Sequence, residues 1–255
     1  MTVPAIERID EGPIQVLRIA RPERRNALDP DALKELRDHA DALRSVTGTR
    51  GVVLTSDAST GVFVSGGDLR VLQGVRTARG ARDLARTAHA AIDALRALGV
   101  PLVAAIGGDA YGGGCELAAA CDVRFAESQA RFHWVQARFG VTTGWGGASN
   151  LLEVVGRGTA MRWLLTAEPV SAQDALSAGF VDAVVDPGTA LDHARAFVAK
   201  VARQPKGGTR RMVFLLRETA RLDARRARVV ELDHFGRSWA TQDHHDAVAR
   251  FLRKA

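Results

Sequence analysis

Two glycine-rich turns carry the residue types best suited to chemistry. Residues 63–69 read FVSGGDL, and residues 107–117 read GGDAYGGGCEL. Adjacent glycines permit backbone angles that other residues avoid, and they let a ligand approach the main-chain amides closely. The second turn leads into an alanine-rich stretch that we predict to be helical, and the free N–H groups at the positive end of a helix attract an anionic oxygen. The pair of turns therefore points to a site that holds negative charge.

Glu116 lies within the second turn, three residues after Gly113. On a helix this spacing is close to one turn, so the carboxylate and the Gly113 amide can face the same pocket. A carboxylate there can act as a general base toward water or toward a substrate C–H group. The alternative is a solvated or helix-capping glutamate with no chemical role.

Other glycine-rich sites fit these turns poorly. A dinucleotide-binding fold requires G-x-G-x-x-G followed by an acidic residue at the end of a second strand, and the turns lack that order. A P-loop requires Lys and Ser or Thr after its last glycine, and no lysine follows here. The nucleophile elbow of a serine hydrolase requires G-x-S-x-G, so Ser65 is not predicted to be a nucleophile.

Alternating strand-like and helix-like segments place these turns in an α/β layer. Short apolar runs predict strands at residues 14–19, 51–55, 102–106 and 122–125. Asp29 followed by Pro30 predicts the start of a helix that reaches about residue 46, and apolar spacing predicts another over residues 79–98. Ser171 and Asp174 resemble a capping box, and beyond about residue 150 the pattern is almost entirely helical.

The bulk composition bounds the class of protein. The 255 residues are 46% hydrophobic and 25% charged, which is the range of an ordinary soluble globular domain. The net charge of +6 fits either attraction of an anionic ligand or a solvated surface, and 31 of the 35 basic residues are arginines. Cys115 and Cys121 form no CxxC pair, so we expect no zinc site and no disulfide framework. Without a secretory signal or a spanning apolar run, we expect a cytoplasmic protein.

Five segments, in order, are similar to motifs of the crotonase superfamily, the enoyl-CoA hydratase/isomerase group. The segment at 101–122 is the most specific of them, because it contains the long G-x-x-x-G-G-G-x-E-L pattern. The matching segments are residues 21–28, 63–69, 101–122, 140–147 and 175–182.

The resemblance implies the fold and the assembly. It implies an α/β crotonase (ClpP-like) core, a spiral of repeated β-β-α units, over residues 1–190. It implies a C-terminal helical region over residues 191–255 that trimerises, so that the protein forms a homotrimer or a homohexamer. It also implies an acyl-CoA substrate, with coenzyme A carried as part of the substrate and with no separate cofactor and no metal.

The resemblance also implies roles for individual residues. The two oxyanion-hole amides fall on Gly67 and Gly113, and one catalytic glutamate of the hydratases falls on Glu116. The residues implied to contact coenzyme A come from the early segment at 21–28 and from the first glycine turn. They are Arg25, Ala27, Leu28, Ser65, Gly66, Asp68 and Leu69.

The sequence departs from the hydratase pattern at Gln136, where the second catalytic glutamate of the hydratases falls. Glutamine cannot act as a general acid or base, but it can hydrogen-bond a water molecule or a carboxylate. His133 is the nearby side chain that could take over proton transfer. The segments 131–140 and 145–147 are locally similar to the branch that decarboxylates methylmalonyl- or ethylmalonyl-type CoA, where loss of CO₂ gives the enolate without a base.

Three functions therefore remain open at this point. The first is an enoyl-CoA hydratase-like lyase of fatty-acid or related acyl-CoA metabolism. The second is a decarboxylase of a short branched malonyl-type CoA. The third is a non-catalytic family member that acts as a pathway partner or binds RNA, although RNA binding would favour a clustered basic face with aromatics, and the arginines here are scattered.

Overall fold

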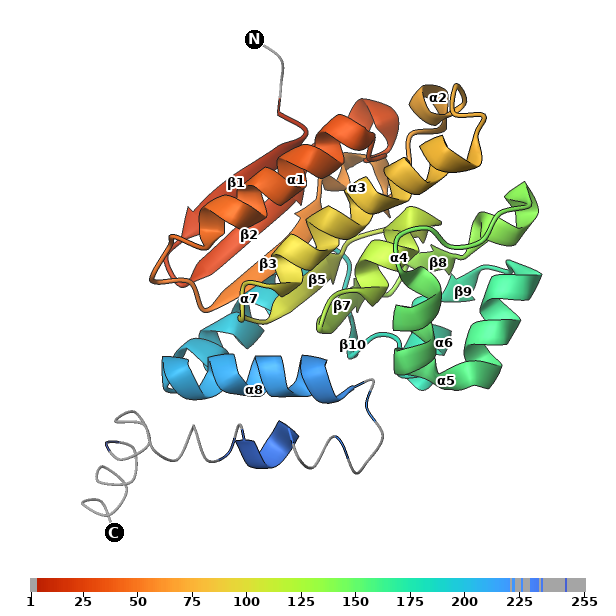
Figure 1. Ribbon diagram of the computed structural model, residues 1–255. Helices are drawn as coiled ribbons and strands as arrows, with labels where there is room; N and C mark the ends of the chain where they lie inside the picture. Colours follow the sequence, from red (N-terminus) through yellow and green to blue (C-terminus); the bar gives the residue numbers. More distant parts are fainter. Residues whose placement is uncertain are drawn as a thin grey trace.

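The computed structural model describes residues 4–220 and, beyond them, residues 222, 226, 230–233, 235 and 246. Within this part the chain forms a six-stranded sheet in the order β1-β2-β3-β5-β7-β10 (Figure 1). The β1–β2 pair is antiparallel, and each later pair is parallel. The strands are β1 (Ile6–Glu11), β2 (Ile14–Ile19), β3 (Gly51–Ser56), β5 (Leu102–Ile106), β7 (Val123–Glu127) and β10 (Ala183–Val185).

A smaller sheet of the described residues contains β4, β6, β8 and β9 in that order. Successive strand pairs are divided between the sheets: β3, β5 and β7 join the large sheet, and β4, β6 and β8, which follow them, join the small one. A helix then returns the chain to the large sheet, which is the repeated β-β-α spiral that the family resemblance implied. The strands are β4 (Val62–Val64), β6 (Asp109–Tyr111), β8 (Arg131–His133) and β9 (Val170–Ser171).

The large sheet is covered on both faces. Along β3, Val52 and Leu54 pack into the main core on the side of α1 (Pro30–Leu43) and α3 (Ala78–Arg96). Val53 points the other way and packs under α7 (Ala190–Ala202). Because alternate residues of a strand face opposite sides, a strand covered twice reads as an unbroken apolar run.

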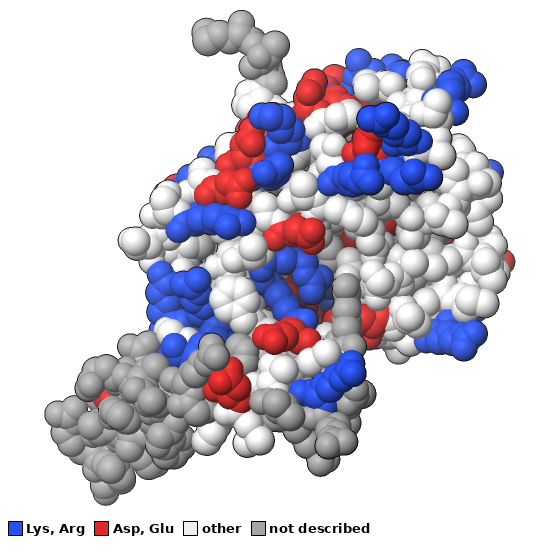
Figure 2. All heavy atoms as spheres, viewed as in Figure 1, with Lys and Arg blue, Asp and Glu red and all other residues white. Residues whose placement is uncertain are grey.

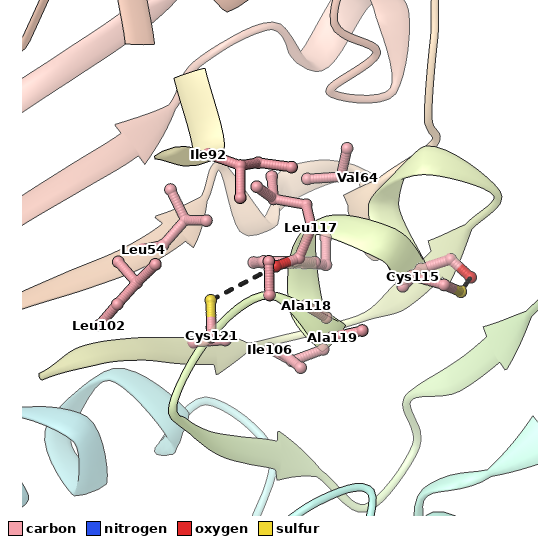
Figure 3. Packing of buried hydrophobic residues seen from close by; sticks show 14 of the residues in the cluster. Leu54, Val64, Ile92, Leu102, Ile106, Cys115, Leu117, Ala118, Ala119 and Cys121 are labelled. Carbon is pink, nitrogen blue, oxygen red and sulfur yellow. Dashed lines mark hydrogen bonds between the residues drawn. The ribbon is translucent and has the colours of Figure 1, made fainter. Parts of the chain in front are cut away.

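Helix α4 (Gly113–Ala119) lies in the centre of the main core. Figure 3 shows Leu117 of α4 among apolar side chains from β3, α3 and β5. Cys115 and Cys121 are both free and buried, and burial raises the pKa of the Cys121 thiol to about 12. Cys121 lies just beyond the end of α4.

The remaining helices complete the chain as far as Thr219. They are α2 (Leu69–Leu72), α5 (Gly147–Thr166), α6 (Ala172–Ser177) and α8 (Lys206–Thr219), with short 3₁₀ turns η1 (Pro22–Arg24), η2 (Ala58–Thr60) and η3 (Val135–Phe139). No helix in the described part of the chain is long and apolar enough to cross a membrane.

The predicted elements agree closely with the structure where caps or long apolar runs marked them. Strands β2 and β5 have the predicted bounds, and Asp29 caps α1 by accepting a hydrogen bond from the Ala32 amide at 2.8 Å. Helix α1 ends at Leu43, a few residues before the predicted end. The prediction of helix alone after residue 150 missed the short strands β9 and β10.

The predicted division into residues 1–190 and 191–255 stays a prediction. Its boundary falls at the first residue of α7, and that helix buries Ala194 and Val198 against the large sheet. Most of residues 221–255 lie outside the described residues.

Candidate active site

The two glycine turns meet in the fold. The first turn is fixed by a bridge to the early segment, in which the Leu28 amide donates to the Gly66 carbonyl at 2.8 Å and the Asp68 amide donates to the Leu28 carbonyl at 3.2 Å. A Cβ atom placed on Gly66 would lie 3.0 Å from the Gly113 nitrogen and 2.9 Å from the Tyr111 oxygen. The turns are therefore in direct contact, and a side chain at position 66 would separate them.

The amides of Gly67 and Gly113 are both available as donors. Gly113 is the first residue of α4, so its N–H has no acceptor within that helix. The preceding amide, that of Gly112, donates to the His133 carbonyl at 2.9 Å. Among the described residues, neither the Gly67 N–H nor the Gly113 N–H donates a hydrogen bond to a protein acceptor.

The indole of Trp145 packs against both glycines. A Cβ atom on Gly113 would lie 2.7 Å from Trp145 Cζ3, and one on Gly67 would lie 3.8 Å from Trp145 Cζ2. The space beside Gly113 is therefore taken by the ring, and only glycine fits there. Trp145 is not among the site residues predicted from the sequence, because only its position in the fold reveals the contact.

Glu116 is 2% exposed, and its carboxylate accepts four hydrogen bonds. Oε1 accepts from Gln136 Nε2 at 2.8 Å and from the Gly144 amide at 3.3 Å. Oε2 accepts from the Trp145 amide at 2.6 Å and from the Gly147 amide at 2.9 Å. All four partners are N–H donors, which suits an ionised carboxylate, since that group is an acceptor only.

Gln136 is brought to Glu116, as the resemblance implied, from the 3₁₀ turn η3. Its side chain is 8% exposed, and its Oε1 atom has no hydrogen-bond partner within the described residues. Leaving a buried acceptor unsatisfied costs about 1–3 kcal/mol, so this oxygen is a favourable place for a donor O–H to bind.

His133 is not brought to Glu116 or Gln136 by any hydrogen bond or ring contact among the described residues. Its ring stacks on Tyr111 with the centroids 4.2 Å apart, and its Nε2 atom lies 3.5 Å from Asp109 Oδ2. Burial lowers the pKa of His133, and the Asp109 carboxylate partly offsets that shift. The alternative in which His133 replaces a catalytic glutamate therefore gains no support from its position.

The early segment at Arg25–Leu28 is held by Asn26. Asn26 is fully buried with a left-handed φ of 56°, and its Nδ2 atom donates to the Asp57 and Val62 carbonyls at 2.9 and 2.8 Å. Ala27 and Leu28 are buried as whole residues, at 6% and 1% exposed, and their main-chain N–H and C=O groups already have partners within the protein. Arg25 is exposed, with its guanidinium 5.3 Å from the centre of the Tyr111 ring.

The residues predicted to bind coenzyme A around the first turn differ in the groups that they offer to a ligand. Ser65 Oγ donates to the Arg24 carbonyl at 3.4 Å, which links the turn to the early segment. Asp68 is buried and caps α2 by accepting from the Arg70 amide at 3.0 Å, and its other carboxylate oxygen has no partner in the described part of the chain. Leu69 is 61% exposed and offers an apolar surface to a ligand.

A spiral β-β-α core in which two glycine turns bring free amides beside a buried carboxylate defines an enzyme that stabilises an oxyanion. The family model described as enoyl-CoA hydratase/isomerase matches residues 10–255. The chain therefore belongs to the enoyl-CoA hydratase/isomerase family, within the crotonase superfamily.

Relatives and solved structures agree with this assignment over nearly the full length. The chain is 33% identical to a crotonyl-CoA hydratase of Syntrophomonas wolfei and 32% identical to a short-chain-enoyl-CoA hydratase of Clostridium acetobutylicum, in each case covering 96% of this chain and 93% of the relative. The crystal structure of an enoyl-CoA hydratase from Mycobacterium smegmatis superposes with a TM-score of 0.93 at 27% identity, covering 99% of this chain and 97% of that one.

Proposed function

We propose that the protein is a hydro-lyase that adds water to the double bond of an enoyl-CoA thioester. The observation that carries the proposal is the pair of free amides at Gly67 and Gly113, which meet beside the buried Glu116 carboxylate. Two such donors stabilise the enolate that forms when charge moves onto the thioester oxygen. Loss of one donor in a site of this kind typically costs about 3 kcal/mol.

One carboxylate is sufficient for the proton balance. The water oxygen attacks the β-carbon, its proton passes to Glu116, and the electrons of the double bond move onto the thioester oxygen. Glu116 then returns the proton to the α-carbon, so that one water molecule is added in total. The Gly144 amide lies 3.3 Å from Glu116 Oε1, the longest of its four hydrogen bonds, and we expect water to take its place.

Gln136 would position the reactants without transferring a proton. Its Nε2 donor holds Glu116, and its free Oε1 acceptor can bind the second O–H of the attacking water. Coenzyme A would bind along Arg25 and the turn at 65–69, with the exposed Leu69 in contact with it and the buried residues 27–28 supporting that surface from beneath. No separate cofactor is needed for this reaction.

The direct test is hydration of crotonyl-CoA by the purified protein. We expect turnover of crotonyl-CoA and thermal stabilisation of the protein by acetyl-CoA. Stabilisation by acetyl-CoA without hydration of any enoyl-CoA would overturn the proposed reaction while retaining the thioester site.

Decarboxylation of a methylmalonyl- or ethylmalonyl-type CoA is the second candidate, and one observation favours it. Glu116 already accepts a hydrogen bond at each of its four positions, and decarboxylation needs the oxyanion hole but no base. An uncharged Gln136 would also avoid repulsion of the departing carboxylate. Release of CO₂ from ethylmalonyl-CoA tests this candidate, and absence of CO₂ alongside hydration of crotonyl-CoA would dismiss it.

We also propose a homotrimer or homohexamer in the cytoplasm, without a nucleic-acid partner. Leu152, Met161 and Leu165 expose large apolar side chains on α5, which is favourable for contact with other subunits. On the face shown in Figure 2, basic side chains form separate groups with acidic ones between them, which is unfavourable for a nucleic-acid surface. Light scattering measures the number of subunits. A salt-sensitive shift in melting temperature on adding RNA would contradict the proposal that the protein has no nucleic-acid partner.

A further inference from the structure

The backbone of Trp145 is anchored on the buried carboxylate of Glu116. Its amide donates to Glu116 Oε2 at 2.6 Å, and the amides of its neighbours Gly144 and Gly147 end on the same carboxylate. The indole then packs against Gly113 and Gly67, the two glycines whose amides form the hole. To move away from the two glycines, the ring must change the side-chain rotamer of Trp145, or the loop at 144–147 must break its hydrogen bonds to Glu116.

A cavity of about 830 Å³ lies beyond this ring, between α3, the start of α5 and α8. Its volume is within the range of small-molecule pockets, roughly 300–1,000 Å³. Trp145 lines the cavity, whereas Gly67, Gly113 and Glu116 do not. The rest of the lining is mixed, because apolar side chains such as Ile92 and Phe214 lie beside the polar His89 and Ser149 and the charged Asp93, Arg96, Arg217 and Glu218.

Trp145 therefore contacts the two glycines of the oxyanion hole and also lines the cavity. The acyl chain of a thioester starts at the carbonyl carbon whose oxygen the two amides hold. A ring in contact with both glycines stands within the first few carbons of that chain, and it separates them from the space beyond.

We propose that Trp145 determines acyl-chain length by closing the hole toward this cavity, so that the enzyme accepts short acyl chains and excludes long ones. The inference rests on the proposed function, because it assigns the substrate range of that same site. Removing the ring joins the hole to the cavity and admits a longer chain.

The test compares the wild type with Trp145→Ala and Trp145→Phe on crotonyl-CoA and oct-2-enoyl-CoA. We expect Trp145→Ala to raise the ratio of kcat/KM for the longer over the shorter substrate by about tenfold or more, since a single methylene that gains apolar contact, here with Ile92 or Phe214, changes kcat/KM by about 10-fold or more. Trp145→Phe should raise the ratio less. Phe139→Ala, which removes an exposed aromatic side chain from η3, is the matched control and should leave the ratio unchanged. An unchanged ratio in Trp145→Ala would overturn the proposal.

A binding measurement separates this inference from the proposed reaction. Calorimetry with the unreactive thioesters butyryl-CoA and octanoyl-CoA needs no turnover. We expect the wild type to bind butyryl-CoA more tightly and Trp145→Ala to reverse or abolish that preference. If crotonyl-CoA is not hydrated but the preference shifts, the proposed reaction fails and the role of Trp145 stands. If the alanine variant does not fold, tighter binding of octanoyl-CoA by the wild type would still overturn the proposal.

Discussion

Glu116 and Asp109 lie seven residues apart, on either side of the same glycine turn, and their surroundings differ in kind. Glu116 is 2% exposed and accepts hydrogen bonds from three main-chain amides and one side-chain amide. Asp109 has a side chain 28% exposed, and it accepts from the Tyr111 hydroxyl at 2.9 Å and the Arg131 amide at 3.0 Å. Its third neighbour, His133, lies 3.5 Å away, which is too far for a strong hydrogen bond.

We propose that the difference separates a carboxylate that takes part in chemistry from one that stabilises the fold. Main-chain donors cannot rotate away as side chains do, so Glu116 is fixed relative to the oxyanion hole. Asp109 lies beside the stacked rings of Tyr111 and His133, and its hydrogen bond with the Arg131 amide links β6 to β8 of the small sheet. The changes below test whether activity depends on the surroundings of Glu116, and whether the residues around Asp109 contribute mainly to stability.

The largest effect is expected from Glu116→Gln. The amide cannot accept a proton, and its NH₂ group would face main-chain N–H donors that now end on a carboxylate. We expect kcat for hydration to fall by about 10²–10⁴-fold. Steady-state kinetics measure this loss, and Asp109→Asn is the matched control that should retain activity. Full activity of the glutamine variant would remove Glu116 from the mechanism.

Gly113→Ala should have the next largest effect. Its Cβ atom would lie 2.7 Å from the Trp145 ring, and overpacking of this kind costs about 1–3 kcal/mol. We expect a lower melting temperature and lower kcat, both partly restored by a second change, Trp145→Ala. Gly158→Ala is the control, because its Cβ would meet nothing within 4 Å. A double variant no better than Gly113→Ala alone would show that the strain does not come from the ring.

Gln136→Glu should alter how stability depends on pH. The new carboxyl would lie beside Glu116, and repulsion between like charges would raise its pKa above the ordinary value of about 4.3. The folded variant would then bind more protons than the unfolded chain, so its stability should fall as pH rises above about 4.3. Denaturant unfolding at several pH values measures this against the wild type. Parallel pH curves would mean that the two carboxyls do not interact.

The smallest effect is expected from His133→Phe, which keeps an aromatic ring stacked on Tyr111. Burial lowers the pKa of His133 below its ordinary 6.5, so the unfolded chain takes up a proton that the folded chain does not as pH falls through that value. The wild type should therefore lose stability below about pH 6.5, and the variant should lose less. Melting temperatures from about pH 7.5 to about pH 5.5 compare the two proteins, and equal losses would show that His133 makes no contribution.

The sequence predicted the parts of the fold that local signals specify. Strands β2 and β5 are short and mainly apolar, and α1 begins at Pro30, after the Asp29 N-cap, because an N-cap followed by proline favours that start. The strands of the small sheet have two or three residues each, too few for a periodic pattern to be recognised. Their positions follow from pairing with strands far along the chain.

The candidate site was predictable only in part for a related reason. Each glycine turn is a local motif and Glu116 lies within the second one, whereas Gln136 was found through the family resemblance. The loop at 144–147 binds Glu116 through main-chain N–H groups, which every residue except proline has. No residue type could have indicated that contact, and the position of Trp145 against the glycines follows from it.

Asn26 has a consequence for engineering this enzyme. By binding the carbonyls of Asp57 and Val62, it joins the segment predicted to contact coenzyme A to the strand that leads into the first glycine turn. A shift of the segment that is predicted to bind coenzyme A would therefore also move the Gly67 amide. A chimera that exchanges the N-terminal segment with that of a relative must also exchange the turn at residues 57–62, or the segment predicted to bind coenzyme A will no longer be aligned with the first glycine turn.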